Sequence, residues 1–376
     1  MSNLNISSLS KENPQQGSTI IRELSHRITW LLPIKNGMPY LSQTLKSIED
    51  QTYKNYEVLI WDNGSTDGTL EEIAMWVPAR IPGRIISDCP LPLGLCLAEM
   101  IQMSNTELCA RIDADDINCP DRLMKQVNYM IDNPEVAAVD SHIDRINENG
   151  HYVDTWDEYP EEHEDIVNNL MRTCKLSHPA VMLRRSMILE IGNYRDFFCD
   201  GQRLPIEDYD LWLRLATRFK LANLPEVLLH YRIHSKSTTQ AAHNSNLSCS
   251  SADQCVAQNA ELLYGCSEAE MLLLRQWRHP NPVIKLHQIA QYLSEHQKYA
   301  KNYPIKTASF LEVGREMMSS KDLISCLKWA SVNGNYYNYL RELVKNFQRG
   351  YKRLTGVPWP ILKYSFCKLL PKTLFS

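Results

Sequence analysis

Three carboxylates crowd into residues 113–116, directly after an apolar run. The run at residues 108–112 has the composition of a buried strand, so the acids are expected where that strand ends. Like charges at this spacing repel one another unless a cation or a positively charged ligand neutralises them. At the carboxyl end of a strand in an open α/β sheet, the expected occupant is a metal-bound phosphorylated ligand. A solvated acidic turn is the alternative, and a lone Asp-x-Asp would favour it.

Strand-like and helix-like segments alternate from residue 28 to about residue 219. The strands are expected at residues 28–33, 56–61, 84–87, 108–112 and 136–139. The helices are expected at residues 40–48, from 67 onward, at 95–103 and at 120–132, the last opened by Pro120. This alternation predicts an α/β domain in which helices cover both faces of a parallel sheet.

Composition limits the class of protein. The chain has 376 residues, enough for two domains or for one large domain with an appendage. An apolar fraction of 44% and a charged fraction of 22% are ordinary for a soluble protein, and a net charge of −4 predicts no nucleic-acid partner. The 11 cysteines are scattered without a C-x-x-C pair, so they predict neither zinc nor disulfides but a reducing compartment. No apolar run is long enough to predict a membrane-spanning helix.

Three regions are predicted along the chain. Residues 1–25 are expected to be a mobile leader, because they lack the apolar stretch of a signal peptide. Residues 26–240 form the α/β domain, and residues 241–376 form a helical region without strand patterns. The segment 345–376 has seven Lys or Arg, no acid and interleaved aromatic residues, which suits an anionic membrane surface. Its prolines interrupt one long amphipathic helix, so a simple solvated tail is the open alternative.

Two polar turns follow the first two predicted strands. Residues 33–37 read Pro-Ile-Lys-Asn-Gly, and residues 61–69 read Trp-Asp-Asn-Gly-Ser-Thr-Asp-Gly-Thr. Both occur at strand-to-helix turns, and such turns line one crevice in this architecture. Because Asn, Asp and Gly also suit tight turns for backbone reasons, neither motif alone indicates a site.

A fourth polar motif lies at residues 207–212, which read Glu-Asp-Tyr-Asp-Leu-Trp and place three acids ahead of a predicted helix. Acids at a helix start are stabilised by the helix dipole, which is a purely structural explanation. However, Asp208 and Trp212 are four residues apart and share a helix face. A carboxylate beside an aromatic wall suits a general base in a partly dry cleft, although Trp212 is equally compatible with the core.

The four motifs, in this order and with these gaps, resemble the family 2 glycosyltransferases of GT-A fold. The resemblance covers residues 28–237, and two further segments match, at residues 177–182 and 231–237. It implies a GT-A type nucleotide-binding sheet with helices on both faces, followed by a helical C-terminal region. One departure is Met100, which stands where members often carry Asn, and this leaves the sugar preference open.

The resemblance implies a role for each donor-side residue. Asp62 would hydrogen-bond the nucleotide base, flanked by Pro33 and Asn36. Asp113 would lie near the ribose. Asp115 would bind a divalent cation, Mn²⁺ or Mg²⁺, that bridges the diphosphate.

The resemblance also implies the remaining roles. Asp208 would deprotonate the acceptor hydroxyl as the catalytic base, and His234 would approach the metal or the diphosphate. Secondary candidates, for the acceptor or for the metal, are Glu207, His178, Trp212, Asp116 and His230. For His178, a hydrogen-bonded structural histidine is the alternative to substrate contact.

The leading hypothesis is an inverting, metal-dependent glycosyltransferase of the hexosyltransferase type. It would move a sugar from a nucleotide-diphosphate sugar, with UDP as the expected nucleotide, to a hydroxyl of a glycan or lipid-linked acceptor in surface polysaccharide biosynthesis. A single base implies inversion, because a retaining double displacement needs a second carboxylate as nucleophile. The expected location is the cytoplasm, with peripheral contact at the inner face of the cell membrane through residues 345–376.

Two alternatives stay open at this point. A sugar nucleotidyltransferase would share the nucleotide-binding half and the metal, but it would carry a Gly-rich basic loop after the first strand. Residues 35–40 are poor in both Gly and Arg. A non-catalytic nucleotide-sugar-binding protein would be expected to lose the base, and the presence of Asp208 argues against it.

Overall fold

The structure, a computed structural model, describes residues 26–272 except 88–89, 158, 171–172, 200–201, 205, 236, 238–246, 265–267 and 269–270. The chain divides into two compact units, Met1–Ala252 and Asp253–Ser376. The predicted leader, the basic aromatic tail and most of the predicted helical region lie outside the described residues. The helices α10 (Leu247–Gln258) and α11 (Ala260–Tyr264) are described from that region. Over the part of the chain that is described, no helix has the length and hydropathy needed to cross a membrane.

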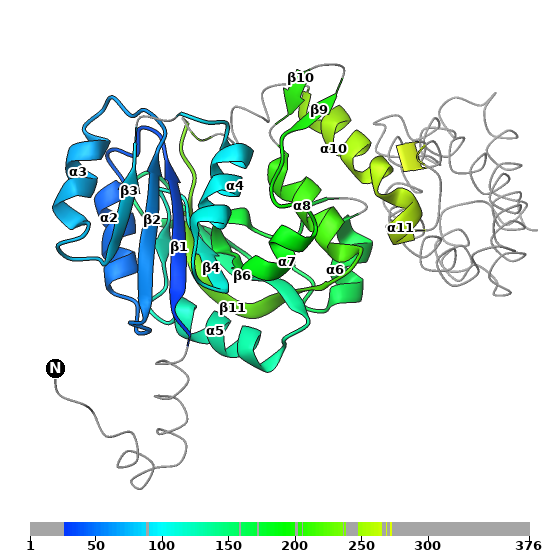
Figure 1. Ribbon diagram of the computed structural model, residues 1–376, viewed down its shortest axis with the longest axis horizontal. Helices are drawn as coiled ribbons and strands as arrows, with labels where there is room; N and C mark the ends of the chain where they lie inside the picture. Colours follow the sequence, from blue (N-terminus) through cyan, green and yellow to red (C-terminus); the bar gives the residue numbers. More distant parts are fainter. Residues whose placement is uncertain are drawn as a thin grey trace, which may run out of the picture. The chain divides into compact units, whose positions relative to one another are not determined.

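A mixed sheet organises the first unit (Figure 1). Among the described residues its order is β3-β2-β1-β4-β8-β6-β11-β5, and β7 pairs with β6. The strand β1 (Ile28–Ile34) pairs in parallel with β2 (Tyr56–Asp62) and with β4 (Leu108–Arg111). The strand β3 (Gly83–Ile86) extends this parallel half beyond β2. All seven residues of β1 are buried, as expected for a strand covered on both faces.

The other half of the sheet is not wholly parallel, so that part of the prediction was wrong. The short strand β8 (Met182–Arg184) runs antiparallel to both β4 and β6 (Val136–Ile146). The long strand β11 (Lys220–Arg232) runs parallel to β6. At the margins, β5 (Ile117–Asn118) pairs antiparallel with β11, and β7 (Tyr152–Trp156) pairs antiparallel with β6. A strand as short as β8 has too few residues for a periodic pattern, and side-chain alternation does not reveal strand direction.

Helices cover both faces of the sheet (Figure 1). One face packs against α2 (Leu41–Glu49), α3 (Thr69–Trp76) and α5 (Arg122–Asp132), in a core that includes Trp30 and Leu32 of β1. The opposite face carries α4 (Leu93–Met103), which contacts β1 and β2. The helices α7 (Arg185–Glu190) and α8 (Glu207–Ala216) pack against α4, and α6 (His163–Leu170) packs against α8.

The small hairpin of β9 (Phe197–Cys199) and β10 (Gln202–Leu204) precedes α8. Because β1, β2 and β4 are parallel, their carboxyl ends meet at one edge of the sheet. The polar turns at residues 33–37 and 61–69 and the acids at residues 113–116 all follow these strand ends. The fold therefore brings three segments that are distant in sequence to a single edge.

Candidate active site

A cavity of about 640 Å³ lies at this edge of the sheet. Its wall combines the end of β1 and the turn after it, the loop after β4, the β6–β7 turn and the segment after β11. The predicted site residues that line it are Pro33, Asn36, Asp113, Asp115 and His234. Other lining residues include Tyr40, Asn63, Cys96 and Glu148.

The turns after β1 and β2 are fastened to each other. Asn36 adopts a positive φ of 56°, which Asn tolerates better than most residues. Its backbone N–H donates to Ser65 Oγ at 2.8 Å, and its side-chain Oδ1 accepts from the Thr66 N–H at 2.9 Å. These two hydrogen bonds connect the two turns at one wall of the cavity.

Asp62 ends β2 and is almost fully buried. Its Oδ2 accepts from the Ser65 N–H at 3.3 Å. Its Oδ1 is buried without a hydrogen-bond partner among the described residues. Because an unpaired buried acceptor is costly, this oxygen is suited to a donor supplied by a ligand. Asp62 itself is not among the residues lining the cavity, whereas its neighbour Asn63 is.

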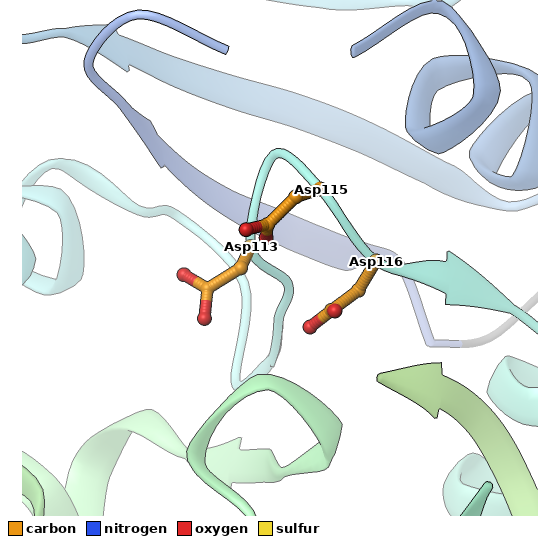
Figure 2. A group of neighbouring side chains, drawn as sticks. All are labelled: Asp113, Asp115 and Asp116. Atoms are coloured by element: carbon orange, nitrogen blue, oxygen red, sulfur yellow. The ribbon is translucent and has the colours of Figure 1, made fainter. Parts of the chain in front are cut away.

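The acid loop, residues 113–116, connects β4 to β5 (Figure 2). Each of Asp113, Asp115 and Asp116 offers a carboxylate oxygen, and these oxygens all lie within 4.8 Å of one another. Asp116 is fully buried, and its Oδ2 has no partner among the described residues. Its other oxygen, Oδ1, accepts from the backbone N–H of Arg232 at 2.8 Å.

Arg111, two residues before Asp113, is the buried cation of this motif. Arg111 donates to both oxygens of Asp113, at 2.8 Å and 2.6 Å. Burial nevertheless raises the pKa of Asp113, although Arg111 opposes the effect. Burial raises the pKa of Asp116 well above its usual value, and the charges of Asp115 and Asp113 raise it further. Among the described residues, no arginine or lysine forms an ion pair with Asp115 or Asp116, so a bound cation would relieve their charge.

His234 lies directly against the acid loop. Its Nε2 is 2.7 Å from Asp115 Oδ2, and its ring centroid is 5.2 Å from that of Tyr40. His230 lies elsewhere, with Nδ1 3.5 Å from Asp144 Oδ2 and Nε2 3.7 Å from Cys119 Sγ. The structure thus brings His234, rather than His230, to Asp115.

The donor atoms of this cluster fit a hard divalent cation. Carboxylate oxygens with one imidazole suit Mg²⁺ or Mn²⁺. The residues that would hold such an ion are Asp115 and His234, with Asp113 and Asp116 beside them. A bound cation would also give a partner to the Oδ2 of Asp116, which has none among the described residues.

A second acidic pair opens α8. The helix begins at Glu207, so the acids lie in its first turn rather than ahead of it as predicted. Burial raises the pKa of Asp208, while the Tyr209 N–H and Arg111 act in the opposite direction. Burial and the charge of Asp208 raise the pKa of Glu207 to about 7. The charge of Asp208 also adds to the effect of burial on the pKa of Asp113, so the pair lies within electrostatic range of the acid loop.

The third acid of this motif has a structural environment. Asp210 is fully buried and accepts hydrogen bonds from Arg195 and Arg214, with nitrogen–oxygen distances of 2.7 to 3.2 Å. This ion cluster attaches α8 to the segment after α7. The sequence motif singled out Asp208 but did not reveal these ion pairs of Asp210.

His178 and Trp212 are both buried next to each other. His178 Nε2 is 2.9 Å from the Tyr194 hydroxyl, and its ring centroid is 5.9 Å from that of Trp212. Burial lowers the pKa of His178 well below its usual value, and the charge of Arg111 lowers it further. The imidazole is therefore neutral near pH 7. Trp212 has no exposed surface, so it packs in the core of this region.

Sequence reasoning missed three residues that the structure brings to the cavity or against its wall: Tyr40, Glu148 and Arg232. Glu148 lies in the β6–β7 turn, and its Oε1 accepts from the Ser235 N–H at 3.3 Å. Nothing in the Asn-Glu-Asn-Gly stretch at residues 147–150 distinguishes it from an ordinary turn. Arg232 belongs to a matched segment, but its role depends on contacts that the spacing does not reveal.

Comparison with known proteins gives consistent matches. The family described as "Glycosyl transferase family 2" matches residues 29–192. The "O-antigen biosynthesis glycosyltransferase WbnJ" of Escherichia coli is 34% identical over 224 residues, covering 57% of this chain and 83% of that protein. The "Amylovoran biosynthesis glycosyltransferase AmsE" of Erwinia amylovora is 29% identical over 194 residues, covering 51% and 70%.

A solved structure supports the fold at much lower sequence identity. GalNAc-T7 with UDP, GalNAc and Mn²⁺ superimposes with a TM-score of 0.50 at 13% identity. The match covers 76% of this chain and 57% of that chain. At this identity, the likeness concerns the fold alone.

Proposed function

This chain belongs to the family 2 glycosyltransferases and is a glycosyltransferase of GT-A fold, and we propose that it is an inverting, metal-dependent enzyme. It transfers a sugar from a nucleotide-diphosphate sugar, with UDP as the nucleotide, to a hydroxyl of a glycan or lipid-linked acceptor. The names of WbnJ and AmsE refer to O-antigen and amylovoran biosynthesis, which supports a role in surface polysaccharide biosynthesis. Family membership leaves the sugar nucleotidyltransferase alternative without support.

The observation that carries the proposal is the meeting of the acid loop with His234 in the same cavity as the donor-side turns. Asp115 and His234 would bind Mn²⁺ or Mg²⁺. When bound, the cation stabilises the negative charge that develops on the departing diphosphate. Burial is the main cause of the raised pKa of Asp113 and Asp116. The raised pKa of these two carboxyl groups supports a site that needs a positive partner.

The donor-side residues bind and orient the nucleotide. The unpartnered Oδ1 of Asp62 accepts a hydrogen bond from the base, and Pro33 and Asn36 form the adjoining wall. Asp113, held by two hydrogen bonds from Arg111, lies towards the ribose. A wall whose turns are hydrogen-bonded to each other lowers the entropic cost of orienting the donor.

Asp208 removes the proton from the acceptor hydroxyl. Its raised pKa, caused by burial, brings its basicity closer to neutral pH, where a general base is most effective. Deprotonation by one carboxylate, with attack from the face opposite the leaving diphosphate, inverts the anomeric carbon. Glu207 lies beside Asp208 in the first turn of α8 and is buried, as are His178 and Trp212.

The catalytic domain proposed here is residues 26–240, and residues 241–376 form an accessory helical region. The enzyme works on the cytoplasmic side of the cell membrane, where nucleotide sugars and lipid-linked acceptors meet. The seven basic residues and interleaved aromatic residues of 345–376 support peripheral contact with anionic lipid.

The test is a calorimetric titration of UDP with and without Mn²⁺, on the parent and on Asp115→Ala. A matched control is Asp144→Ala, which removes the other carboxylate that faces a histidine, His230. We expect Mn²⁺-dependent binding in the parent and the control, and its loss in Asp115→Ala. Binding of GDP or dTDP instead of UDP, with the same metal dependence, would overturn only the nucleotide assignment. No binding by any nucleotide would mean that the acid loop is a solvated turn and would refute the proposal.

A further inference from the structure

Arg232, the last residue of β11, is a buried arginine that holds several parts of the cavity wall together. Its Nε donates to the backbone carbonyl of Asp115 at 2.8 Å. Its Nη1 donates to the carbonyls of Asn147 and Glu148, both at 3.2 Å, and its Nη2 donates to Gln43 Oε1 at 2.8 Å. The guanidinium thus connects the acid loop, the β6–β7 turn and α2.

The chemistry of these contacts is unusual for an arginine beside three carboxylates. All four hydrogen-bond acceptors named above are neutral: three are backbone carbonyls and one is a side-chain amide. A planar guanidinium offers five N–H donors in fixed directions, whereas lysine offers one nitrogen on a flexible chain. Only arginine can therefore satisfy acceptors on three separate segments at once. The guanidinium of Arg232 therefore acts through the directions of its N–H groups, which fix the positions of the backbone carbonyls that accept from them.

The segments that Arg232 connects are the ones that carry the cavity-lining groups. Asp115 and Glu148 line the cavity, and their carbonyls accept from the guanidinium. Tyr40 also lines it, and the guanidinium lies 4.6 Å from the centre of the Tyr40 ring. That ring in turn contacts His234, which pairs with Asp115. The backbone N–H of Arg232 fixes Asp116, so every member of the metal-binding group except Asp113 has a contact leading back to Arg232.

We propose that Arg232 is a positioning residue for cation and diphosphate binding: it sets the position of Asp115 relative to Tyr40, Glu148 and His234. This inference rests on the proposed function. Arg232 is not among the cavity-lining residues, so it acts through its neighbours rather than by touching the donor. Outer residues that orient metal ligands typically change metal affinity by about 10- to 100-fold when replaced.

The test compares two buried arginines replaced by lysine. Arg232→Lys keeps the charge but cannot reach all the acceptors. Arg122→Lys is the matched control, because Arg122 is also fully buried and also donates to backbone carbonyls, of Arg111, Pro179 and Val181. None of the acceptors of Arg122 lines the cavity. Both variants lose packing and hydrogen bonds in the interior, so both are expected to lower the melting temperature.

The quantity measured is the ratio of UDP affinity with Mn²⁺ to UDP affinity without it, which a general loss of stability does not change. We expect this ratio to fall by about 10- to 100-fold in Arg232→Lys and to stay at the parent value in Arg122→Lys. Gln43→Ala is a milder variant, since the Gln43 side chain is exposed and only one acceptor is lost. It is expected to lower the ratio in the same direction by a smaller factor, and it keeps the test decisive if Arg232→Lys does not fold.

An unchanged ratio in Arg232→Lys, or in Gln43→Ala where Arg232→Lys does not fold, would overturn the inference while leaving the proposed function intact. An equal fall in Arg122→Lys would also overturn it, because the effect would then follow from the loss of any buried arginine. If the parent itself showed no Mn²⁺-dependent binding, the proposed function would fail and this inference with it.

Discussion

The parallel half of the sheet, formed by β3, β2, β1 and β4, is stabilised differently from the mixed half, formed by β8, β6, β11 and β5. In the parallel half, β1 and β2 are almost entirely apolar and buried. The mixed half has three register shifts between β6 and β11. It also has buried charged groups in Asp140, Asp210 and Arg232, whereas those of the parallel half, Asp62 and Arg111, stand at the carboxyl ends of β2 and β4.

This difference separates the proposed donor side of the site from the proposed base, Asp208, and from His234. The donor-side turns follow directly from where apolar strands stop, so local sequence determines them. His234 and Asp208 are positioned by the mixed half, through directional hydrogen bonds and ion pairs between distant segments. Non-polar packing tolerates small shifts, whereas a buried ion pair leaves an uncompensated charge when one partner is removed. The two halves should therefore respond differently to substitution.

The largest effect on stability is expected for Asp210→Ala in the mixed half. The substitution leaves Arg214, which is mostly buried, without its carboxylate. Breaking a buried ion pair in this way is expected to lower the free energy of unfolding by about 4 kcal/mol. Denaturant unfolding measures it, and a loss below about 1 kcal/mol, the range of exposed ion pairs, would remove the proposed contrast between the halves.

A somewhat smaller effect is expected for Leu32→Ala in the parallel half. Leu32 has no exposed surface and lies in the core that α2, α3 and α5 share. Loss of buried methyl and methylene groups and the resulting cavity are expected to cost about 3 kcal/mol. Because the contact is apolar, the loss should be the same in 0.05 M and 0.5 M salt. A marked salt dependence would show that this half also relies on charge.

Gly94→Ala tests the contact between the halves and is expected to have a smaller effect. A methyl group at Gly94 would lie 3.1 Å from Glu207 Cβ and 3.2 Å from the Arg195 carbonyl. The crowding costs about 1–3 kcal/mol, and the better helix propensity of Ala returns about 1 kcal/mol. We expect a net loss of about 1 kcal/mol, measured by thermal unfolding. The control Leu95→Ala alters a half-exposed neighbour on the same helix, and an equal loss there would contradict the steric explanation.

A change in the pH dependence of stability, rather than in stability at one pH, is expected for Asp140→Asn. Burial raises the pKa of Asp140 to about 8, although the Ser177 N–H opposes the shift. Between the ordinary carboxyl pKa and about 8, the folded state binds a proton that the unfolded state has lost, so this contribution to stability falls as the pH rises. The Asp140→Asn variant has no carboxyl group at this position and so does not bind this proton. Its melting temperature relative to the parent should therefore rise from pH 5 to pH 9. Parallel pH profiles would contradict the assignment of a buried, protonated Asp140.

Much of the parallel half could be predicted from the sequence. The strand at 56–61 and the helix at 40–48 appear as β2 (Tyr56–Asp62) and α2 (Leu41–Glu49), because apolar periodicity is a local property. The cavity-lining residues Asn36 and Asp115 follow strand ends, which made their convergence predictable.

The mixed half was harder to predict for a physical reason. The strand expected at 136–139 continues to Ile146, since residues 140–145 also pair with β11. These residues are largely polar, so apolar periodicity did not predict the continuation. Arg232 contacts Asp115 and Gln43, which lie 117 and 189 positions away in sequence. Hydrogen bonds over such separations leave no periodic pattern in the chain. For the same reason, the ion pair of Asp210 with Arg195 could not be predicted.

The most direct test of the account is Asp208→Asn, measured both for Mn²⁺-dependent UDP binding and for the rate of UDP release from a UDP-sugar. Asp144→Asn is the control, as a carboxylate of the mixed half that faces His230 rather than the acid loop. We predict that Asp208→Asn lowers the rate by about 10²- to 10⁴-fold while the calorimetric affinity for UDP with Mn²⁺ stays at the parent value. An unchanged rate, or a loss of binding that matches the loss of rate, would contradict this account. In this account, separate halves of the sheet position the donor site and the proposed base.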